Sequence, residues 1–204
     1  MKIESLQAEE AAVMSAAQAM CAAARTAPKA CGIDKLDSMI LTGADKDALS
    51  AEMRRIAEVG GDTFFIRDAE NVDKSLAVVL IGTEEKPRGV DRVCSLCGWD
   101  GCADCVKHNG KCIMNSVDLG IAVGSAVSVA ADLRIDNRIM FTAGKAAASL
   151  GLLGDKKLIF GIPLSVSGKS PFLTENLTAE AVYKEKGCFG AARILKEEIR
   201  WASL

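Results

Sequence analysis

The sequence predicts a domain of the α/β or α+β class in which helices cover both faces of a single sheet. Segments with helical spacing of apolar residues alternate along the chain with short, almost wholly apolar runs that are typical of strands. Half of the 204 residues are hydrophobic but only 4% are aromatic, and much of the apolar content is alanine. Such a composition favours helices that pack closely through small side chains. The length suits one large domain, or one domain that carries an insertion.

The first quarter of the chain is predicted to form two helices and a strand. Apolar residues recur at helical spacing over about residues 6 to 25. Pro28 limits this helix, because the residue before a proline disfavours helical dihedrals. A strand is predicted at Ser38 to Leu41. Asp45 then caps a second helix, which ends at Gly60-Gly61.

Two apolar runs in the next segment predict strands. Phe64 to Ile66 is short and apolar, which indicates an edge strand. Ser75 to Gly82 is almost wholly apolar and lies between charged loops. This pattern is typical of a central strand that is buried on both faces.

A long helix is predicted from Val117 to Leu133, where small residues are spaced along an apolar segment. Glycine costs a helix interior about 1 kcal/mol relative to alanine. Glycines and serines in this helix therefore indicate the close approach of another helix or of a flat ligand. These small residues are Gly120, Gly124, Ser125 and Ser128.

The last third of the chain is predicted to hold two helices and one strand. A helix rich in small residues covers about Ala143 to Leu150, and a buried strand follows at Lys157 to Ile162. A loop is expected at Gly168 to Pro171. Apolar residues at helical spacing then predict a terminal amphipathic helix from Phe189 to Trp201.

Charge and composition exclude several classes of protein. The formal net charge is −2, basic residues are scattered, and a single Tyr and two Trp provide no stacking platform, so no nucleic-acid partner is expected. Glutamates interrupt the N-terminal segment, where a signal peptide needs basic residues and then an apolar run. The longest apolar stretch, Leu119 to Ala131, is shorter than the roughly 20 residues that span a bilayer. We therefore expect a cytoplasmic protein with no membrane segment.

In a reducing compartment, cysteines indicate metal ligands or redox groups before they indicate disulfides. Five of the eight cysteines lie in one short segment, at x2, x4, x2 and x6 spacing. The x2 spacing lets two thiolates converge on a metal from a tight turn, and Gly98 and Gly101 relieve the backbone strain of so short a loop. The predicted metal ligands are Cys94, Cys97, Cys102, Cys105 and Cys112.

The spacing favours an iron–sulfur cluster over zinc. Cys97-x4-Cys102-x2-Cys105 has the spacing of the plant-type [2Fe–2S] ferredoxin loop. A structural zinc site usually places a longer linker between its two cysteine pairs. Cys94 and Cys112 compete to be the fourth ligand, so that both a 4Fe-4S and a 2Fe-2S cluster are open, with zinc as the alternative metal. The single histidine, His108, is interpreted as a bystander.

The other three cysteines lie outside this segment. Cys21 falls on the apolar face of the first predicted helix, and we interpret it as a small core residue. Cys31 lies in a turn beside Gly32, and we favour a core residue over a reactive thiol there. Cys188 carries no signal for either role.

Two segments that flank the cysteines carry a resemblance to a known family. With Arg25-Thr-Ala-Pro-Lys-Ala-Cys-Gly32 upstream and Asp136-Asn-Arg-Ile-Met-Phe-Thr-Ala-Gly144 downstream, the cluster resembles an uncharacterised prokaryotic family described as ferredoxin-domain proteins. The resemblance covers nearly the whole chain up to about Pro171. It implies an iron–sulfur centre and supplies no reaction.

Three further motifs are similar to those of the flavin-dependent nitroreductases: Ala23-Ala-Arg-Thr-Ala-Pro28, Val117-Asp-Leu-Gly120 and Phe160-Gly-Ile-Pro163. This resemblance implies an α+β fold with a mixed sheet wrapped by helices. The chain would then be a single nitroreductase-like domain over residues 1–204, with a cysteine-rich metal-binding insertion at 94–112. It also implies an intertwined homodimer with FMN at the subunit interface.

The nitroreductase resemblance implies four flavin contacts. Pro28 and the pair Gly144-Lys145 would meet the flavin, and Lys169 would contact its phosphate. The chain departs from the family in two places. The opening Arg-x-Ser-x-Arg that grips the phosphate has no counterpart, and Lys29 replaces the usual serine.

Three functions follow from these patterns. The first is electron transfer by an iron–sulfur protein on a nitroreductase-like scaffold, with FMN as a second centre and an unidentified redox partner or small-molecule acceptor. The second is an FMN-dependent reductase with a structural zinc site. The third is a non-enzymatic metal or redox sensor. The sequence holds no Ser/His/Asp set, phosphate loop or glycine fingerprint, and acid–base chemistry would fall to carboxylates such as Asp118 or Asp132.

Overall fold

The chain divides into two compact units, Met1–Phe172 and Leu173–Leu204. The computed structural model describes residues 2–173, and everything below concerns this part of the chain. The terminal helix predicted at Phe189 to Trp201, and Cys188, lie outside the described residues. The expectation of one domain over 1–204 remains a prediction.

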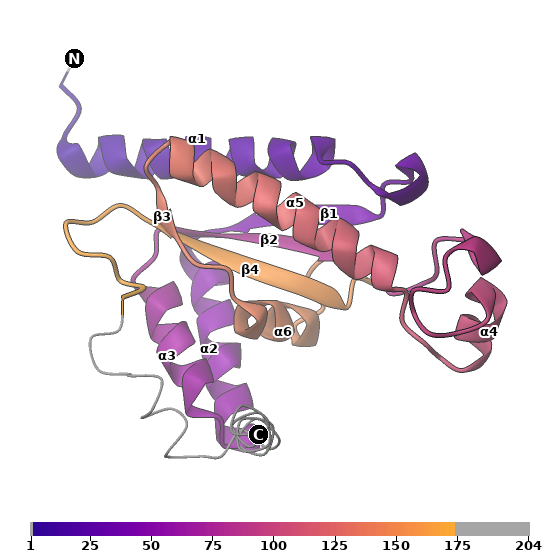
Figure 1. Ribbon diagram of the computed structural model, residues 1–204. Helices are drawn as coiled ribbons and strands as arrows, with labels where there is room; N and C mark the ends of the chain where they lie inside the picture. Colours follow the sequence, from indigo (N-terminus) through magenta and orange to yellow (C-terminus); the bar gives the residue numbers. More distant parts are fainter. Residues whose placement is uncertain (1, 174–204) are drawn as a thin grey trace, which may run out of the picture. The chain divides into compact units, whose positions relative to one another are not determined.

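A four-stranded sheet forms the middle layer, in the order β1-β2-β4-β3 (Figure 1). Its strands are β1 (Leu36–Leu41), β2 (Ala77–Thr83), β3 (Asp136–Asn137) and β4 (Leu158–Ser165). Strand β2 lies between two neighbours and is buried along its whole length, which confirms the predicted central strand. Each pairing among these strands is antiparallel, whereas we expected a mixed sheet.

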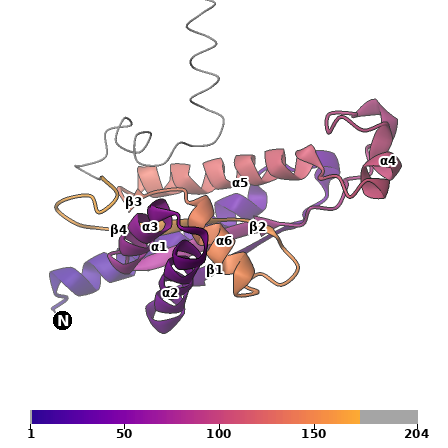
Figure 2. The same ribbon diagram turned by 90° about the horizontal axis from the view of Figure 1, so that it is seen from below.

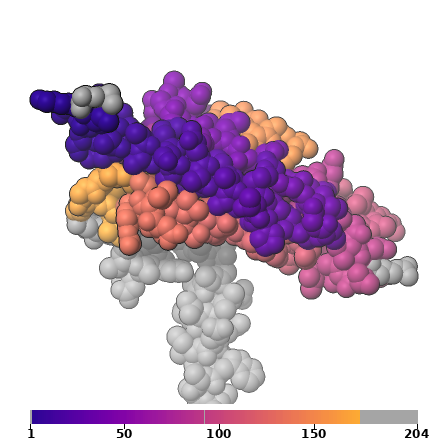
Figure 3. All heavy atoms as spheres, turned by 90° about the horizontal axis from the view of Figure 1, so that it is seen from above, coloured from indigo at the N-terminus to yellow at the C-terminus, as the bar shows by residue number. Residues whose placement is uncertain are grey.

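Helices α1 (Ser5–Thr26) and α5 (Ile113–Asp132) cover one face of the sheet. They pack side by side, as the view from above shows (Figure 3). Alanines and small apolar residues line their contact with the sheet, and Ser125 Oγ donates a hydrogen bond to the Ala23 carbonyl at 3.1 Å. α1 ends just before Ala27 and Pro28, as the sequence predicts. The buried residues of α5 are Asn115, Asp118, Leu119, Ala122, Val123, Ala126 and Ala130.

Helices α2 (Gly43–Gly60), α3 (Thr63–Asp73) and α6 (Phe141–Ser149) cover the opposite face (Figure 2). Their apolar side chains form a second core with the other face of β2 and β4. α6 packs so close to β4 that a Cβ added at Gly144 would lie 1.7 Å from the Ile159 carbonyl oxygen. This three-layer arrangement confirms the predicted α+β class with helices on both faces of the sheet.

Two local predictions differ from the structure. Phe64 to Ile66 belongs to α3 and forms no strand. Phe65, Ala69 and Val72 recur at the spacing of one helix face and are buried together, so tertiary packing decides an apolar run that was too short to assign by periodicity. Asp45 lies in the first turn of α2, and the residue that precedes this helix is Thr42.

Helix α5 begins at Ile113, four residues before the predicted start, directly after Cys112. By length and composition it is the one helix among residues 2–173 that could cross a membrane. Its buried residues pack against α1 and the sheet as those of a core helix do. A Cβ added at Gly120 or Gly124 would meet no other atom of the described residues within 4 Å. The expected close approach is therefore not made at these two glycines inside the described unit, whereas Ser125 does approach the backbone of α1.

Candidate metal centre

The connection between β2 and α5, residues 84–112, extends beyond the end of the sheet as a separate lobe (Figure 1). It contains a 3-10 helix, η2 (Asp91–Val93), and the short helix α4 (Gly101–Lys107). The lobe contains a small cavity that is partly open to solvent. All five clustered cysteines line it: Cys94, Cys97, Cys102, Cys105 and Cys112.

Local structure explains why these cysteines meet. Cys94 follows η2, and Cys112 is the residue that precedes α5. Cys102 and Cys105 lie three residues apart on α4, so they share one face of that helix. The turn between Cys97 and Cys102 uses positive φ at Gly98 (82°) and Gly101 (84°), a conformation that glycine adopts without strain. The sequence prediction for both glycines is confirmed.

Burial differs among the five thiols. Cys105 and Cys112 are buried, and the other three are half-buried. Burial raises the pKa of the Cys105 thiol, and its hydrogen bond with Cys97 and the nearby Cys97, Cys112 and Cys102 sulfurs raise it further. In the metal-free chain this thiol is therefore neutral at pH 7. A metal that binds here must displace its proton.

Asp91 holds Cys102 through two hydrogen bonds. The Asp91 backbone N–H donates to Cys102 Sγ at 3.3 Å, and the Cys102 N–H donates back to Asp91 Oδ1 at 3.2 Å. Asp91 adopts φ of 58°, an uncommon conformation for a residue other than glycine. Sequence reasoning missed this residue, because no spacing rule relates it to the cysteines.

A stacked aromatic pair, Trp99 and His108, lies near Cys105. Trp99 and His108 stack with ring centroids 4.4 Å apart and planes inclined by 5°. A Cβ at Gly110 would lie 2.4 Å from Trp99 Nε1 and 2.9 Å from Cys105 Sγ, so the three groups are in close contact. His108 Nδ1 lies 2.9 Å from the Asp104 carbonyl oxygen, and His108 is not among the residues that line the cavity. This placement agrees with a bystander role.

The thiols surround the cavity without converging on one point. Among residues 2–173, no group of three or more His, Cys, Asp or Glu side chains is arranged to hold a metal ion as it stands. Gathering the ligands around a bound group therefore requires movement of side chains in the lobe.

The four predicted flavin contacts lie on different layers. Pro28 follows α1, on the face covered by α1 and α5, and is exposed. Gly144 is buried in α6 on the opposite face, where contact with Ile159 explains its small size. Lys145 is exposed on α6, and Lys169 lies in the exposed segment after β4. The structure does not bring these four residues together within one chain.

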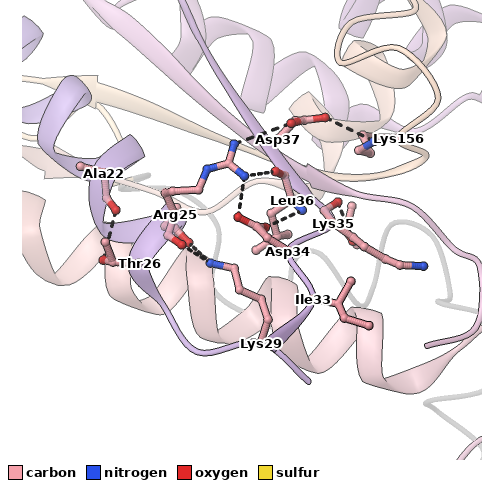
Figure 4. Close-up of polar contacts among 12 residues, drawn as sticks. Ala22, Arg25, Thr26, Lys29, Ile33, Asp34, Lys35, Leu36, Asp37 and Lys156 are labelled. Carbon is pink, nitrogen blue, oxygen red and sulfur yellow. Dashed lines mark hydrogen bonds and ion pairs between the residues drawn. The ribbon is translucent and has the colours of Figure 1, made fainter. Parts of the chain in front are cut away.

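The segment that follows Pro28 is held by a polar network (Figure 4). Arg25 Nη1 donates to Asp34 Oδ2 at 2.6 Å and to the Leu36 carbonyl at 2.9 Å. Lys29 Nζ donates to the Ala24 carbonyl at 2.8 Å and to that of Arg25. Lys29 therefore caps the C-terminus of α1, where a cation is favoured by the helix dipole.

Cys31 is exposed and adopts φ of 58°, so the expectation that it is a core residue is wrong. The chain must turn sharply between α1 and β1, which places this thiol on the outside of the turn. Cys21 is half-buried and packs against the core formed by α1, α5 and the sheet, in agreement with the prediction.

The fold and the site define a class of protein: a nitroreductase-like α+β domain with a cysteine-lined lobe between two core elements. Residues 108–173 match the model of a family described as uncharacterized proteins containing a ferredoxin domain, a match that includes Cys112. An uncharacterized protein of Archaeoglobus fulgidus is 43% identical over 169 residues, which cover 78% of this chain and 90% of the relative. The chain belongs to this uncharacterised ferredoxin-domain family.

Similar solved structures are nitroreductases. A nitroreductase with bound FMN from Bacteroides fragilis has a TM-score of 0.52 at 12% identity, over 87% of this chain and 85% of that one. The nitroreductase CinD of Lactococcus lactis in complex with chloramphenicol has a TM-score of 0.51 at 15% identity, over 81% of this chain and 85% of that one. At these identities the likeness establishes the fold alone.

Proposed function

We propose that this chain is an iron–sulfur electron-transfer protein on a nitroreductase-like scaffold. The observation that carries the proposal is the cavity lined by all five clustered cysteines. Thiolates are the ligands of iron–sulfur clusters, and the carboxylate that also lines the cavity, that of Asp91, accepts a hydrogen bond from the Cys102 N–H. A cytoplasmic location, which keeps these thiols reduced, is part of the proposal.

Cys97, Cys102, Cys105 and Cys112 are the proposed ligands. The first three have the plant-type spacing, and in that pattern the fourth cysteine follows the x2 pair, as Cys112 does here. Cys112 and Cys105 are the two buried thiols of the lobe. Cys97, Cys102 and Cys112 are also the sulfurs whose charges act on Cys105. Cys94 then lies at the rim of the same cavity.

A bound cluster would supply one-electron chemistry, and the residues of the lobe would hold and shield it. The Asp91 N–H donates to the Cys102 sulfur, and hydrogen bonds to sulfur are one of the factors that set the reduction potential of such a centre. Trp99, which stacks on His108, lies beside Cys105 at Gly110 and would help to shield this thiolate from water.

Anaerobic purification tests the proposal directly. The protein should be brown, with the broad visible absorbance of thiolate-ligated iron–sulfur centres, and should contain iron and acid-labile sulfide in equal amounts. Colourless protein with one equivalent of zinc would overturn the proposal and favour a structural zinc site.

A homodimer is the second part of the proposal. Ile113, Val117 and Ile121 are 42%, 45% and 41% exposed and recur every four residues along α5. Gly120 and Gly124 are exposed on the same helix, and a Cβ added at either would meet no other described atom within 4 Å. A row of apolar and small residues of this kind is suited to the close approach of a second copy.

FMN binding is a second candidate function, favoured by the fold shared with a nitroreductase that binds FMN. Pro28 lies on one layer and Lys145 on the other, so a flavin site that uses both requires a second subunit. Excess FMN should raise the melting temperature, because a ligand that binds only the folded state stabilises it. Lys169→Ala should weaken this effect and leave the iron content unchanged. An unchanged melting curve and unquenched FMN fluorescence would exclude the flavin without affecting the iron–sulfur proposal.

A further inference from the structure

Arg88 is a fully buried cation at the edge of the cysteine cavity. Its side chain has no solvent exposure, and it lines the cavity together with the five cysteines. Its Nη1 donates to the Ile33 carbonyl. Its Nε atom is buried and has no hydrogen-bond partner within residues 2–173. A buried guanidinium with an unused donor is costly unless something nearby compensates it.

Asp118 is the buried ion-pair partner of Arg88. Arg88 Nη2 and Asp118 Oδ2 form an ion pair, although they are not aligned as a hydrogen bond. Asp118 is 2% exposed, and its Oδ1 accepts a hydrogen bond from the Ala30 N–H at 2.9 Å. Asp118 does not line the cavity. Of the two charged residues of this buried pair, only Arg88 therefore lines the cavity together with the cysteines.

The segment that carries Arg88 is fastened to α5 in register. The Cys112 N–H donates to the Glu85 carbonyl at 3.4 Å, and Asn115 Nδ2 donates to the Lys86 carbonyl at 2.6 Å. The third contact of this series is the ion pair between Asp118 and Arg88. Positions 112, 115 and 118 lie on one face at the start of α5, so this face holds both the proposed ligand Cys112 and the cation Arg88 in place.

We propose that Arg88 is the residue that raises the reduction potential of the metal centre, and that Asp118 is the residue that positions it. This inference rests on the proposed iron–sulfur function. A cluster held by four thiolates gains one negative charge when it accepts an electron. A cation at the cavity wall stabilises the reduced form more than the oxidised form, and Asp118 partly offsets this effect from farther away. The other charged group at the wall is Asp91, which opposes Arg88 and is present in every variant below.

The test is the midpoint potential of the iron-loaded protein, measured by a spectroscopic redox titration. Asp118→Asn keeps the acceptor for the Ala30 N–H, removes the offsetting charge and should raise the potential. Arg88→Met combined with Asp118→Asn removes the whole pair and should lower it below that of the wild type. The expected separation of the two variants is about tenfold in the ratio of reduced to oxidised protein at a fixed potential, or about 59 mV for one electron.

Asp68→Asn is the matched control. Asp68 is 4% exposed, pairs with Arg67 and accepts a hydrogen bond from Thr142 Oγ1, but it lies on the opposite face of the sheet. The substitution changes the net charge by the same amount as Asp118→Asn and should leave the potential unchanged. The inference requires the midpoint potential to be lowest in the double variant, intermediate in the wild type and highest in Asp118→Asn. Any other order of the three potentials overturns it.

Iron content separates this inference from the proposed function. Iron and sulfide retained in every variant, with unchanged potentials, would overturn the role of Arg88 and leave the iron–sulfur proposal standing. If the Asp118→Asn variant does not fold, the Arg88→Lys variant is measured in its place. Arg88→Lys keeps the charge and should have a potential above that of the double variant, and an equal or lower potential would overturn the inference. A folded double variant without iron would assign the pair to cluster assembly and would overturn it as well.

Discussion

The Asp91 N–H donates to Cys102 Sγ at 3.3 Å, while the Cys102 N–H donates to the Asp91 carboxylate at 3.2 Å. The two residues thus fix each other, although eleven positions separate them in the chain. This reciprocal contact closes the loop that carries Cys94 and Cys97 against α4. The ordered structure of the lobe therefore depends on the Asp91 side chain, which is not itself a proposed ligand.

Asp91→Ala should therefore loosen the lobe. The substitution removes the acceptor for the Cys102 N–H, a loss worth about 1 kcal/mol, or about fivefold. We expect iron to be lost to a chelator about fivefold faster than from the wild type, as followed by the decay of visible absorbance. Asp91→Asn keeps an acceptor oxygen and is the control, and equal rates for the two variants would contradict this role of the carboxylate.

Cys102→Ser should abolish the visible absorbance, because Cys102 belongs to the proposed ligand set for either cluster type. Cys21→Ser is the matched control, since Cys21 lies on α1 and packs against the core. It should retain both colour and iron. Iron and sulfide analysis of the two purified variants checks the prediction, and full colour in Cys102→Ser would remove this residue from the ligand set.

Ile121→Glu should convert the proposed dimer to a monomer. A dimer that buries more than about 2,000 Å² in total does not tolerate an unpaired charge in the middle of its interface. Val59→Glu is the control, because Val59 is 80% exposed on α2, in the opposite layer. Sedimentation at micromolar concentration measures the outcome. A monomeric wild type would contradict the proposal at once.

Gly144→Ala should destabilise the fold strongly. An added Cβ would lie 1.7 Å from the Ile159 carbonyl oxygen, which is backbone and cannot move aside without displacing β4 from α6. Overpacking of this kind costs at least about 1–3 kcal/mol. Lys145→Ala, the next and exposed position of α6, should change the stability by less than about 0.5 kcal/mol. Chemical denaturation of both variants checks the difference, and equal stabilities would show that the helix and strand can separate.

Glu52 should make stability depend on acid pH. Hydrogen bonds from Arg55 and Ser149 lower the pKa of the Glu52 carboxyl from 4.5 to about 2. A lowered pKa means that the contribution is fully present above pH 4.5 and is lost as the pH falls toward about 2. Because the Arg55 side chain is exposed, we expect Glu52→Gln to cost at most about 1 kcal/mol at pH 7.

That cost should vanish near pH 2, where the wild-type carboxyl is itself half protonated or more. Urea unfolding at several pH values measures the difference between the two proteins. Glu58→Gln, at an exposed position of the same helix, is the control for the loss of one carboxylate. A cost for Glu52→Gln that stays constant down to pH 2 would show that packing, and not charge, is responsible.

Local patterns in the sequence determined most of the secondary structure and located the cysteines of the candidate metal centre. Apolar periodicity over many residues located α1, α2 and α5, and the unbroken apolar run from Ser75 to Gly82 located the central strand. The x2, x4 and x2 spacing with its glycines identified the thiols, because ligand spacing and turn geometry are both local properties of the chain.

Only the tertiary structure decided what depends on contacts between distant segments. Phe64 to Ile66 is too short for periodicity to distinguish helix from strand, and its packing beside α2 made it helical. The pairing of Arg88 with Asp118, and of Asp91 with Cys102, also left no local pattern. A buried charge is recognised by what surrounds it, and those surroundings come from the segment after α1, from α5 and from the lobe only after these have folded together.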